Sequence, residues 1–397
     1  MNILFYTGFQ IEPTKGGTER ISYTLAKNLS LCFGYNCYSM SYYGCDDFQS
    51  DVFSDSIYLQ KYKKKDYKTV IKDFLSKYKI SVIINQGAFD INPLFVSLKL
   101  ELGFKIILAH HFSPGWEENF FSLNQLLLDY SKAKGRVSKT RHFLKIFLYP
   151  ILKPYKKIKL KKEYHMGYLS SDLVVLLSEQ FKTSFMRYAK ISDDSKFRFI
   201  PNMLSFDSFY PKNELSKKKK QVLIVARLEE LSKRLSLALH IWKLIESSNE
   251  VNDWSLHVVG DGPDRLFYHK LAEQLGLKRI IFHGHQNPIP FYRTASIYMM
   301  TSRSESWGLS LTESQQMGLV PLAFDSYASL EDIISDGLNG YIIADNNVKL
   351  YTERMINIMK DENKRCDMAV QALQSSCRFK AENIVEMWRY YLHETCI

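Results

Sequence analysis

Short apolar runs alternate along this 397-residue chain with longer stretches in which apolar residues recur every three or four positions. The runs predict buried strands and the periodic stretches predict helices, and their alternation is typical of βα units around parallel sheets. Helices are expected to include residues 19–29 and 67–77. Strands are expected at 3–6, 37–41, 82–85, 105–109, 172–177 and 197–200, and in a second series at 222–226, 255–259, 280–283, 296–300, 320–324 and 340–343.

The two series of strands predict two domains. A polar, lysine-rich stretch at 210–220 separates them and has the composition of a linker. The chain is also long enough for two cores. We therefore expect one Rossmann-like domain over 1–203 and a second over 204–378, followed by a C-terminal helix over 379–397. A ligand is expected to bind in the cleft between such domains.

Composition excludes several classes of protein. No apolar stretch reaches the length of a transmembrane helix, and the amino terminus lacks the features of a signal peptide. The six cysteines show no CxxC pairs or nearby histidine spacing, which argues against a zinc site. We expect a cytoplasmic protein with reduced thiols.

The formal net charge of +11 is concentrated in one segment. Residues 136–162 contain ten Lys or Arg and no Asp or Glu, interleaved with apolar residues. This pattern predicts an interfacial segment on an anionic membrane surface, in two short helical pieces because Pro150 and Pro154 interrupt it. The alternative is a basic loop that packs over the first domain. Charge alone also fits a nucleic-acid-binding protein.

The stretch Ser302–Ser314 carries two glutamates between two predicted strands. Gly308 allows the chain to turn, and the N–H groups of Gly308 and Leu309 are expected to open a helix that ends at Gly318. Glu305 then lies in the loop and Glu313 on the helix. Carboxylates accept hydrogen bonds from vicinal hydroxyls, and a helix start suits a phosphate. Either glutamate alone would also fit an ordinary helix surface.

Two further stretches carry groups suited to a phosphate. Arg227 and Lys233 follow the first strand of the second series, where two cations suit a diphosphate, although solvated charge is the simpler alternative. Gly16 and Gly17 lie between the first strand and the first helix, where the backbone can approach an anion or simply turn. The later Gly260-Asp-Gly-Pro263 has ordinary turn chemistry.

Two histidines end the strand expected at 105–109. His110 and His111 precede Pro114, which keeps the strand from continuing, so they are expected to face the cleft. They are candidates for a ligand-binding role, with structural histidines as the alternative.

Taken in sequence order, these features resemble the retaining glycosyltransferases of family 4. The match consists of the Glu-x7-Glu motif of Glu305 and Glu313, the Arg/Lys pair, the Gly-Gly loop, and the stretches 200–202, 260–263 and 330–340. It covers nearly the whole chain and is strongest over 220–345. The resemblance implies an α/β protein of the GT-B fold: two doubly wound Rossmann-like domains facing across a cleft, with the C-terminal helix packing back toward the first.

The resemblance also implies roles in the second domain. Arg227 and Lys233 would neutralise the donor diphosphate, with N–H donors from Gly308–Leu309. Glu313 would hold the ribose, and Glu305 would contact hydroxyls of the transferred sugar.

In the first domain, Gly16 and Gly17 would close against the diphosphate. His111, or in second place His110, would be the active-site histidine. Two departures from the family pattern are Trp307, where phenylalanine is usual, and Ser314, where alanine is usual.

The implied activity is retaining transfer of a hexose or N-acetylhexosamine from a nucleotide sugar to a saccharide acceptor. UDP is the favoured carrier and GDP the alternative; no metal or other cofactor is expected, because two cations neutralise the diphosphate. We expect a lipid-linked acceptor in bacterial surface polysaccharide biosynthesis, at the inner face of the cell membrane, and no nucleic-acid partner. The alternatives are a sugar-nucleotide epimerase of the same fold and a nucleotide-sugar-binding protein without turnover.

Overall fold

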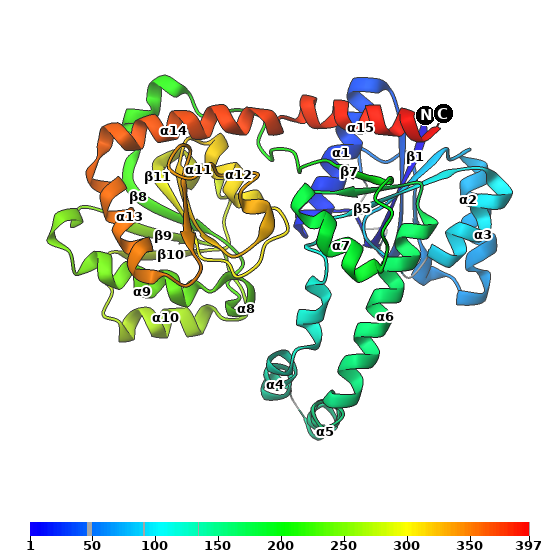
Figure 1. The fold of residues 1–397 in the computed structure, drawn as a ribbon, viewed down its shortest axis with the longest axis horizontal. Coiled ribbons are helices and arrows are strands. Elements are labelled where there is room, and N and C mark those ends of the chain that lie inside the picture. The colour runs from blue at the N-terminus through cyan, green and yellow to red at the C-terminus, as the bar shows by residue number, and fades with distance from the viewer. Residues whose placement is uncertain (46–49, 90–91, 134, 397) are drawn as a thin grey trace. The chain divides into compact units, whose positions relative to one another are not determined.

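A computed structural model describes residues 1–45, 50–89, 92–133 and 135–396 (Figure 1). The chain forms two compact units. Unit 1 comprises Met1–Ile200 together with Val385–Ile397, and unit 2 comprises Pro201–Ile384. Each unit is built on one parallel sheet.

Unit 1 contains a seven-stranded sheet in the order β3-β2-β1-β4-β5-β6-β7, with every adjacent pair parallel. All six strands predicted in this half are confirmed. The seventh, β3, escaped prediction because three residues are too few to show an alternating pattern. The strands are β1 (Asn2–Phe9), β2 (Asn36–Tyr43), β3 (Ser56–Tyr58), β4 (Val82–Asn85), β5 (Lys105–His110), β6 (Leu173–Leu176) and β7 (Phe197–Phe199).

Helices connect these strands and bury the sheet. Because β1 has β2 on one side and β4 on the other, right-handed connections place helices on both faces, as in a doubly wound fold. The central strands are accordingly apolar on both faces, and Ile3, Phe5 and Ile83 are fully buried. The α-helices are α1 (Gly17–Phe33), α2 (Tyr67–Lys77), α3 (Asn92–Leu102), α4 (Leu123–Lys132), α5 (Arg136–Phe147), α6 (Tyr149–Ser170), α7 (Lys182–Ala189) and α15 (Ala381–Cys396).

Unit 2 contains a six-stranded parallel sheet in the order β10-β9-β8-β11-β12-β13. The strands are β8 (Lys219–Val225), β9 (Ser255–Val259), β10 (Ile280–Gly284), β11 (Ala295–Met300), β12 (Val320–Asp325) and β13 (Tyr341–Ala344). The α-helices are α8 (Glu230–Lys233), α9 (Leu235–Glu246), α10 (Arg265–Gln274), α11 (Ile289–Thr294), α12 (Leu309–Gln316), α13 (Val348–Lys360) and α14 (Glu362–Ser376). The two doubly wound parallel sheets predicted from the apolar pattern are confirmed.

The lysine-rich stretch 210–220 is not a linker. Lys212–Lys217 form a 3-10 helix whose Leu215 is buried, and β8 already begins at Lys219. Tyr210 is also buried, and the Lys218 ammonium lies 4.1 Å from its ring centroid. The apolar residues among the lysines pack this stretch against unit 2. The prediction of a linker was wrong because it relied on the charged residues alone.

The basic segment 136–162 forms helices α5 and α6. The prediction of two pieces is confirmed, but the second is not short: α6 runs for 22 residues and passes through Pro154. Pro150 lies in the first turn of α6, where its missing N–H costs nothing. In Figure 1, α4 and α5 lie across the far end of α6, away from the sheet of unit 1. We call α4, α5 and residues 149–159 of α6 the arm.

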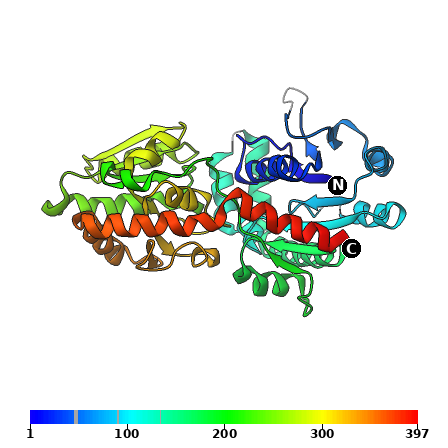
Figure 2. The same ribbon diagram turned by 90° about the horizontal axis from the view of Figure 1, so that it is seen from above.

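Helix α15 packs on unit 1, as predicted for the C-terminal helix. The Tyr35 hydroxyl lies 2.9 Å from Nε2 of His393, and the Arg198 guanidinium pairs with the Glu394 carboxylate. The Arg389 guanidinium lies 5.1 Å from the ring centroid of Phe33, the last residue of α1. Both views show α15, in red, lying along this unit (Figures 1 and 2).

Two histidines at the end of β5 are buried in unit 1. The Tyr164 hydroxyl lies 3.1 Å from Nε2 of His110, donates to the Glu117 carboxylate at 3.0 Å, and accepts the Gly115 N–H at 3.0 Å. The His111 imidazole pairs with the Gln86 side-chain carbonyl. Burial lowers the pKa of His110 to about 3 and that of His111 to about 4, so both rings are neutral at pH 7.

We predict that acid destabilises unit 1 through these histidines. A histidine in the unfolded chain binds a proton below about pH 6.5, whereas the folded protein binds one only near pH 4 at His111 and pH 3 at His110. The contribution of the neutral histidines to the free energy of unfolding is therefore fully present above pH 6.5 and is lost as the pH falls. Each histidine should lower the free energy of unfolding by about 1 kcal/mol between pH 6.5 and 5.5. Urea unfolding at both pH values measures the loss, which should be smaller in the His110→Asn, His111→Asn double variant. Equal losses in both proteins would contradict the prediction.

Candidate functional site

The predicted site residues lie at the carboxyl edge of each sheet, beside the point where strand order reverses. In unit 2 the reversal lies between β8 and β11, which are followed by Arg227 and by the loop containing Glu305. In unit 1 it lies between β1 and β4, which are followed by the Gly16–Gly17 turn and by Gln86. Open parallel sheets bind ligands at this position, because helices cover both faces and leave only the edge accessible.

In unit 2, Lys233 and Glu305 form an ion pair. The Lys233 ammonium donates to Oε1 of Glu305 at 2.5 Å, and the Ser302 hydroxyl donates to the same oxygen at 2.7 Å. The lysine and glutamate side chains are 24% and 13% exposed. An ammonium has three donors, so Lys233 can bind this carboxylate and still donate to an anionic ligand.

Arg234 fixes the loops that carry this pair, and its role was missed in the sequence. Its guanidinium is buried and donates to the carbonyl oxygens of Thr301 at 3.0 Å and Ser302 at 2.9 Å, and to the Asp345 carboxylate at 2.7 Å. Its backbone is left-handed, with φ of 47°. One side chain thus joins the chain segments after β11 and β13 to the residue beside Lys233. Nothing in the sequence distinguishes it from the neighbouring lysine.

The turn at Gly308 opens helix α12 as the sequence predicted. Gly308 adopts φ of 81°, a left-handed conformation that glycine takes without strain, and serves as the N-cap. The N–H groups of Leu309 and Ser310 begin the helix, where no earlier carbonyl of the helix is available to them. This end can therefore donate hydrogen bonds to an anion.

Glu313 lies on α12 with only 3% of its surface exposed. Its Oε2 accepts a hydrogen bond from the Tyr292 hydroxyl at 3.1 Å. Tyr292 also donates to the carbonyl oxygen of Ser310 at 3.2 Å, so it ties Glu313 to the first turn of the helix. Tyr292 was not predicted from the sequence, because it comes from α11, which lies between β10 and β11 and away from the Glu313 stretch in the chain.

Arg227 is exposed and follows β8 in the chain. The short loop that it lies in leads to α8, whose last residue is Lys233. The loop beside it contains Gly260, which has φ of 138°; a Cβ atom there would lie 1.9 Å from the carbonyl oxygen of Ala226. Gly260 is therefore required for close packing of the two loops, which supports the structural interpretation of this turn.

Trp307 is buried with its ring 5.3 Å from that of Phe379, so it packs in the core of unit 2.

In unit 1, Gly16 is the N-cap of α1 and Gly17 its first residue. The Gly16 backbone is extended, and a Cβ there would lie 2.3 Å from a carboxylate oxygen of Glu19. The turn thus presents backbone N–H groups at the carboxyl edge of the sheet.

The adjacent His110 and His111 have different surroundings. His110 lies among aromatic rings, with the centroids of Tyr164 and Phe185 at 5.3 and 5.6 Å. His111 is 8% exposed and pairs with Gln86, which follows β4 at the reversal of strand order. His110 thus has a structural environment, whereas His111 lies beside the edge where ligands bind in such sheets.

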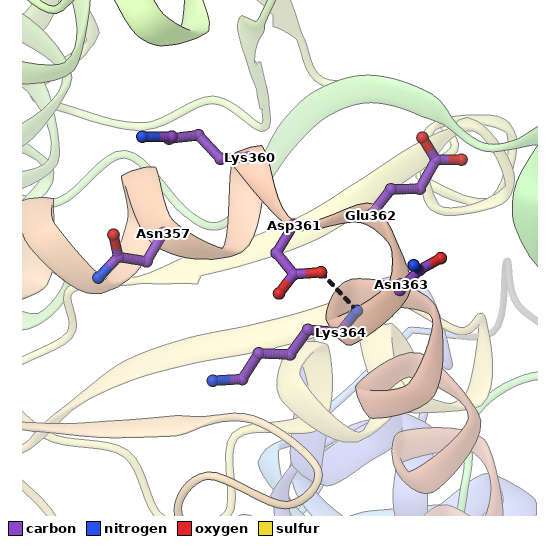
Figure 3. A pocket seen from close by; sticks show the side chains of 6 residues that line it. All are labelled: Asn357, Lys360, Asp361, Glu362, Asn363 and Lys364. Atoms are coloured by element: carbon purple, nitrogen blue, oxygen red, sulfur yellow. Dashed lines mark hydrogen bonds between the residues drawn. The ribbon is translucent and has the colours of Figure 1, made fainter.

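An open hollow on unit 2 lies apart from the predicted site residues, where α13 meets α14 (Figure 3). The Asp361 carboxylate accepts the Lys364 N–H at 2.9 Å there and caps α14. The lining residues, of mixed charge, are those of a capped helix junction: Asn357, Lys360, Asp361, Glu362, Asn363 and Lys364. In the described ranges, no three His, Cys, Asp or Glu side chains group closely enough to hold a metal ion.

Comparison with known proteins agrees with this arrangement. Residues 205–374 match the family model described as glycosyl transferases group 1. An uncharacterized glycosyltransferase of Haemophilus influenzae is 24% identical over 386 residues, which cover 94% of this chain and 95% of the relative. The amylovoran biosynthesis glycosyltransferase of Erwinia amylovora is 23% identical over 385 residues, covering 95% and 96%.

Solved structures share the fold. Anabaena HepE in complex with UDP and glucose superposes with a TM-score of 0.70 at 15% identity, over 99% of this chain and all of that one. TarM superposes with a TM-score of 0.72 at 13% identity, over 98% of each chain. The carboxyl-terminal part of the chain is thus similar to the glycosyl transferases of group 1, and glycosyltransferase relatives extend over nearly its whole length. The two parallel sheets and the solved structures show that the chain has the GT-B fold.

Proposed function

We propose that this protein is a glycosyltransferase that moves a hexose or N-acetylhexosamine from a UDP-sugar to a saccharide acceptor, with retention of anomeric configuration and without a metal. The observation that carries the proposal is the edge of the unit 2 sheet, where Lys233 and Glu305 are held together near the open start of α12. These groups match the two halves of a nucleotide sugar: cations and N–H donors for the diphosphate, and carboxylates for hydroxyl groups. HepE, which shares the fold, was solved with UDP and glucose.

Breaking the bond between the sugar and the diphosphate leaves negative charge on the departing phosphate. Arg227 and Lys233 would stabilise that charge, with the N–H groups of Gly308 and Leu309 adding donors at the helix start. Because the ammonium of Lys233 is already positioned by Glu305, little reorganisation is needed when the charge develops. Glu305 would contact the transferred sugar, and Glu313, anchored by Tyr292, would bind the ribose.

In unit 1 we assign the active-site role to His111 rather than His110. The His110 ring contacts Tyr164 and has a structural surrounding, whereas His111 lies by the reversal of strand order with the Gly16–Gly17 turn. Its lowered pKa keeps the imidazole neutral, so it would act as a hydrogen-bonding group toward the sugar and not as a cation.

The proposed acceptor is a lipid-linked saccharide in bacterial surface polysaccharide synthesis, handled at the inner face of the cell membrane. Two observations support it: the relative from Erwinia amylovora is named for amylovoran biosynthesis, and the arm combines dense positive charge with exposed apolar residues. A lipid-linked acceptor stays in the bilayer, so the enzyme must work at its surface.

We predict that Lys233→Ala and Glu313→Ala each weaken binding of the UDP-sugar. Loss of a hydrogen bond to a charged group costs about 1.5–3 kcal/mol, which corresponds to roughly a 10- to 150-fold higher Kd. Titration calorimetry measures the change. Lys220→Ala is the matched control, because Lys220 pairs with Asp253 on the surface of the same unit and should leave the affinity unchanged. Unaltered affinity in both test variants would refute the assignment.

We also predict that the product retains the anomeric configuration of the donor and that turnover persists in excess EDTA. The physical reason is that two cations already neutralise the diphosphate. Proton NMR of the product gives the anomeric configuration. An inverted product, or activity that is lost with chelator and restored by manganese, would contradict the mechanism. Release of an epimerised sugar nucleotide in the absence of acceptor would identify an epimerase.

Finally, we predict that His111→Ala lowers kcat at least tenfold with little change in donor Kd. His110→Ala should instead lower the urea midpoint of unit 1, because it removes a buried partner of Tyr164, and should retain more of the turnover. Single-turnover kinetics and urea unfolding of both variants separate the two effects. The opposite ranking of turnover would transfer the role to His110.

A further inference from the structure

The arm of unit 1 exposes apolar side chains on three successive helices. Helix α5 contacts both α4 and α6, so the three form one structural element. The exposed apolar residues are Leu123, Leu127 and Tyr130 on α4, Val137, Phe143, Leu144 and Phe147 on α5, and Ile151, Tyr155 and Ile158 on α6. Phe147 is 72% exposed and Ile151 68%. Single exposed apolar residues are ordinary, but a group of this size marks a surface that another phase or molecule covers.

Helix α5 is inverted relative to a normal surface helix. Phe143, Leu144 and Phe147 are three and four positions apart, so they share one face, and all three are exposed. The partly buried positions Ser138, His142 and Ile146 repeat every four residues on the other side. A helix that packs in a water-soluble protein turns its apolar face inward. Here the apolar face is outward.

Helices α5 and α6 of this element are strongly basic. Between Arg136 and Lys162 there are ten Lys or Arg and no Asp or Glu. Three of the lysines, Lys153, Lys156 and Lys157, line a cavity of about 210 Å³ beside α6. Its single carboxylate, Glu118, lies 3.4 Å from Lys157 and leaves the cavity with an excess of positive charge.

Burial along α6 shows where the arm leaves the body of unit 1. The buried residues of α6 begin at Leu160, and its first eleven residues have none. Because α4 and α5 lie across this free end, α5 is remote from the sheet (Figure 1). The lysines of the cavity lie four to eight residues after Tyr149, the first residue of α6, which corresponds to a rise of about 6–12 Å along the helix axis.

We propose that the arm binds an anionic bilayer, with α5 lying in the membrane interface. Its outward face would enter the acyl boundary, where an amphipathic helix lies about 5–10 Å deep. Helix α6 would rise from there through the headgroups, whose layer is of comparable thickness, and would place Lys153, Lys156 and Lys157 among lipid phosphates. No helix in the described part of the chain is long and apolar enough to span a bilayer.

The surface has the chemistry of a lipid contact and not of an ordinary protein contact. A protein interface is depleted of lysine, whereas an interfacial helix is flanked by lysine and arginine. The inference goes beyond the proposed function, because binding of vesicles requires neither donor nor acceptor. A protein that binds vesicles and lacks transferase activity would contradict only the proposed function.

Sedimentation of the full chain with vesicles tests the proposal. Vesicles of phosphatidylglycerol and phosphatidylcholine should bind the protein, more strongly as the phosphatidylglycerol fraction rises and less at high salt, because screening weakens the attraction. The apolar variant Phe143→Ser, Leu144→Ser, Phe147→Ser and the charge variant Lys153→Glu, Lys156→Glu, Lys157→Glu should each reduce binding at least tenfold.

Two control variants match these changes elsewhere. Leu31→Ser, Leu100→Ser, Leu266→Ser removes exposed apolar side chains outside the arm, and Lys63→Glu, Lys64→Glu, Lys65→Glu reverses three exposed charges of unit 1. Both should bind as the unaltered protein does. Circular dichroism checks that every variant keeps its helices.

Three outcomes would overturn the proposal. The first is that the unaltered protein fails to sediment with anionic vesicles at low salt. The second is that the arm variants bind vesicles as tightly as their controls. The third is a change in oligomeric state, measured by light scattering, that is caused by the apolar arm variant while vesicle binding persists. That result would assign the face to contacts between copies of the chain.

Discussion

The site of unit 2 depends on the buried guanidinium of Arg234. A buried charge is tolerated only when its hydrogen-bond donors are satisfied, and Arg234 meets this requirement with two main-chain carbonyls, the Asp345 carboxylate and the side-chain oxygen of Asn346 at 3.1 Å. The same bonds offset the cost of a left-handed backbone at a residue other than glycine, of the order of 1 kcal/mol. Lys233 and the start of the Glu305 loop are thus held by one anchor, and the ion pair between them is a consequence of it.

Parallel sheets explain how much of the architecture could be predicted from sequence. Strands covered on both faces must be apolar throughout, so twelve of the thirteen strands in the described residues were visible as apolar runs. Polar chemistry therefore had to collect where those runs end. Glu305, Glu313, Arg227 and the Gly16–Gly17 turn were predicted as site residues by that logic. Prediction failed where local signals were overridden: α6 continues through Pro154, and buried Leu215 anchors a lysine-rich stretch.

Contacts between residues far apart in the chain could not be predicted from the sequence pattern. Arg234 looks like one more surface cation, and Tyr292 like one more aromatic residue, until the fold brings them to Ser302 and Glu313. The paired histidines show the opposite case. Successive residues at a strand end point to opposite sides, so the chain itself requires His110 and His111 to have different neighbours. Which of the two faces the aromatic cluster is decided by the packing of α6 and α7.

The discontinuity of unit 1 has a consequence for how the protein is made. Its sheet is complete at Phe199, yet the part of α15 that pairs with Tyr35 and Arg198 follows the last residue of unit 2. Synthesis runs from the amino terminus at about 5–20 residues per second, so roughly ten to forty seconds separate the last strand of unit 1 from α15. During that interval the second sheet can close on the ribosome while the first still lacks its final helix. Unit 1 therefore cannot be complete until nearly the whole chain has been synthesised.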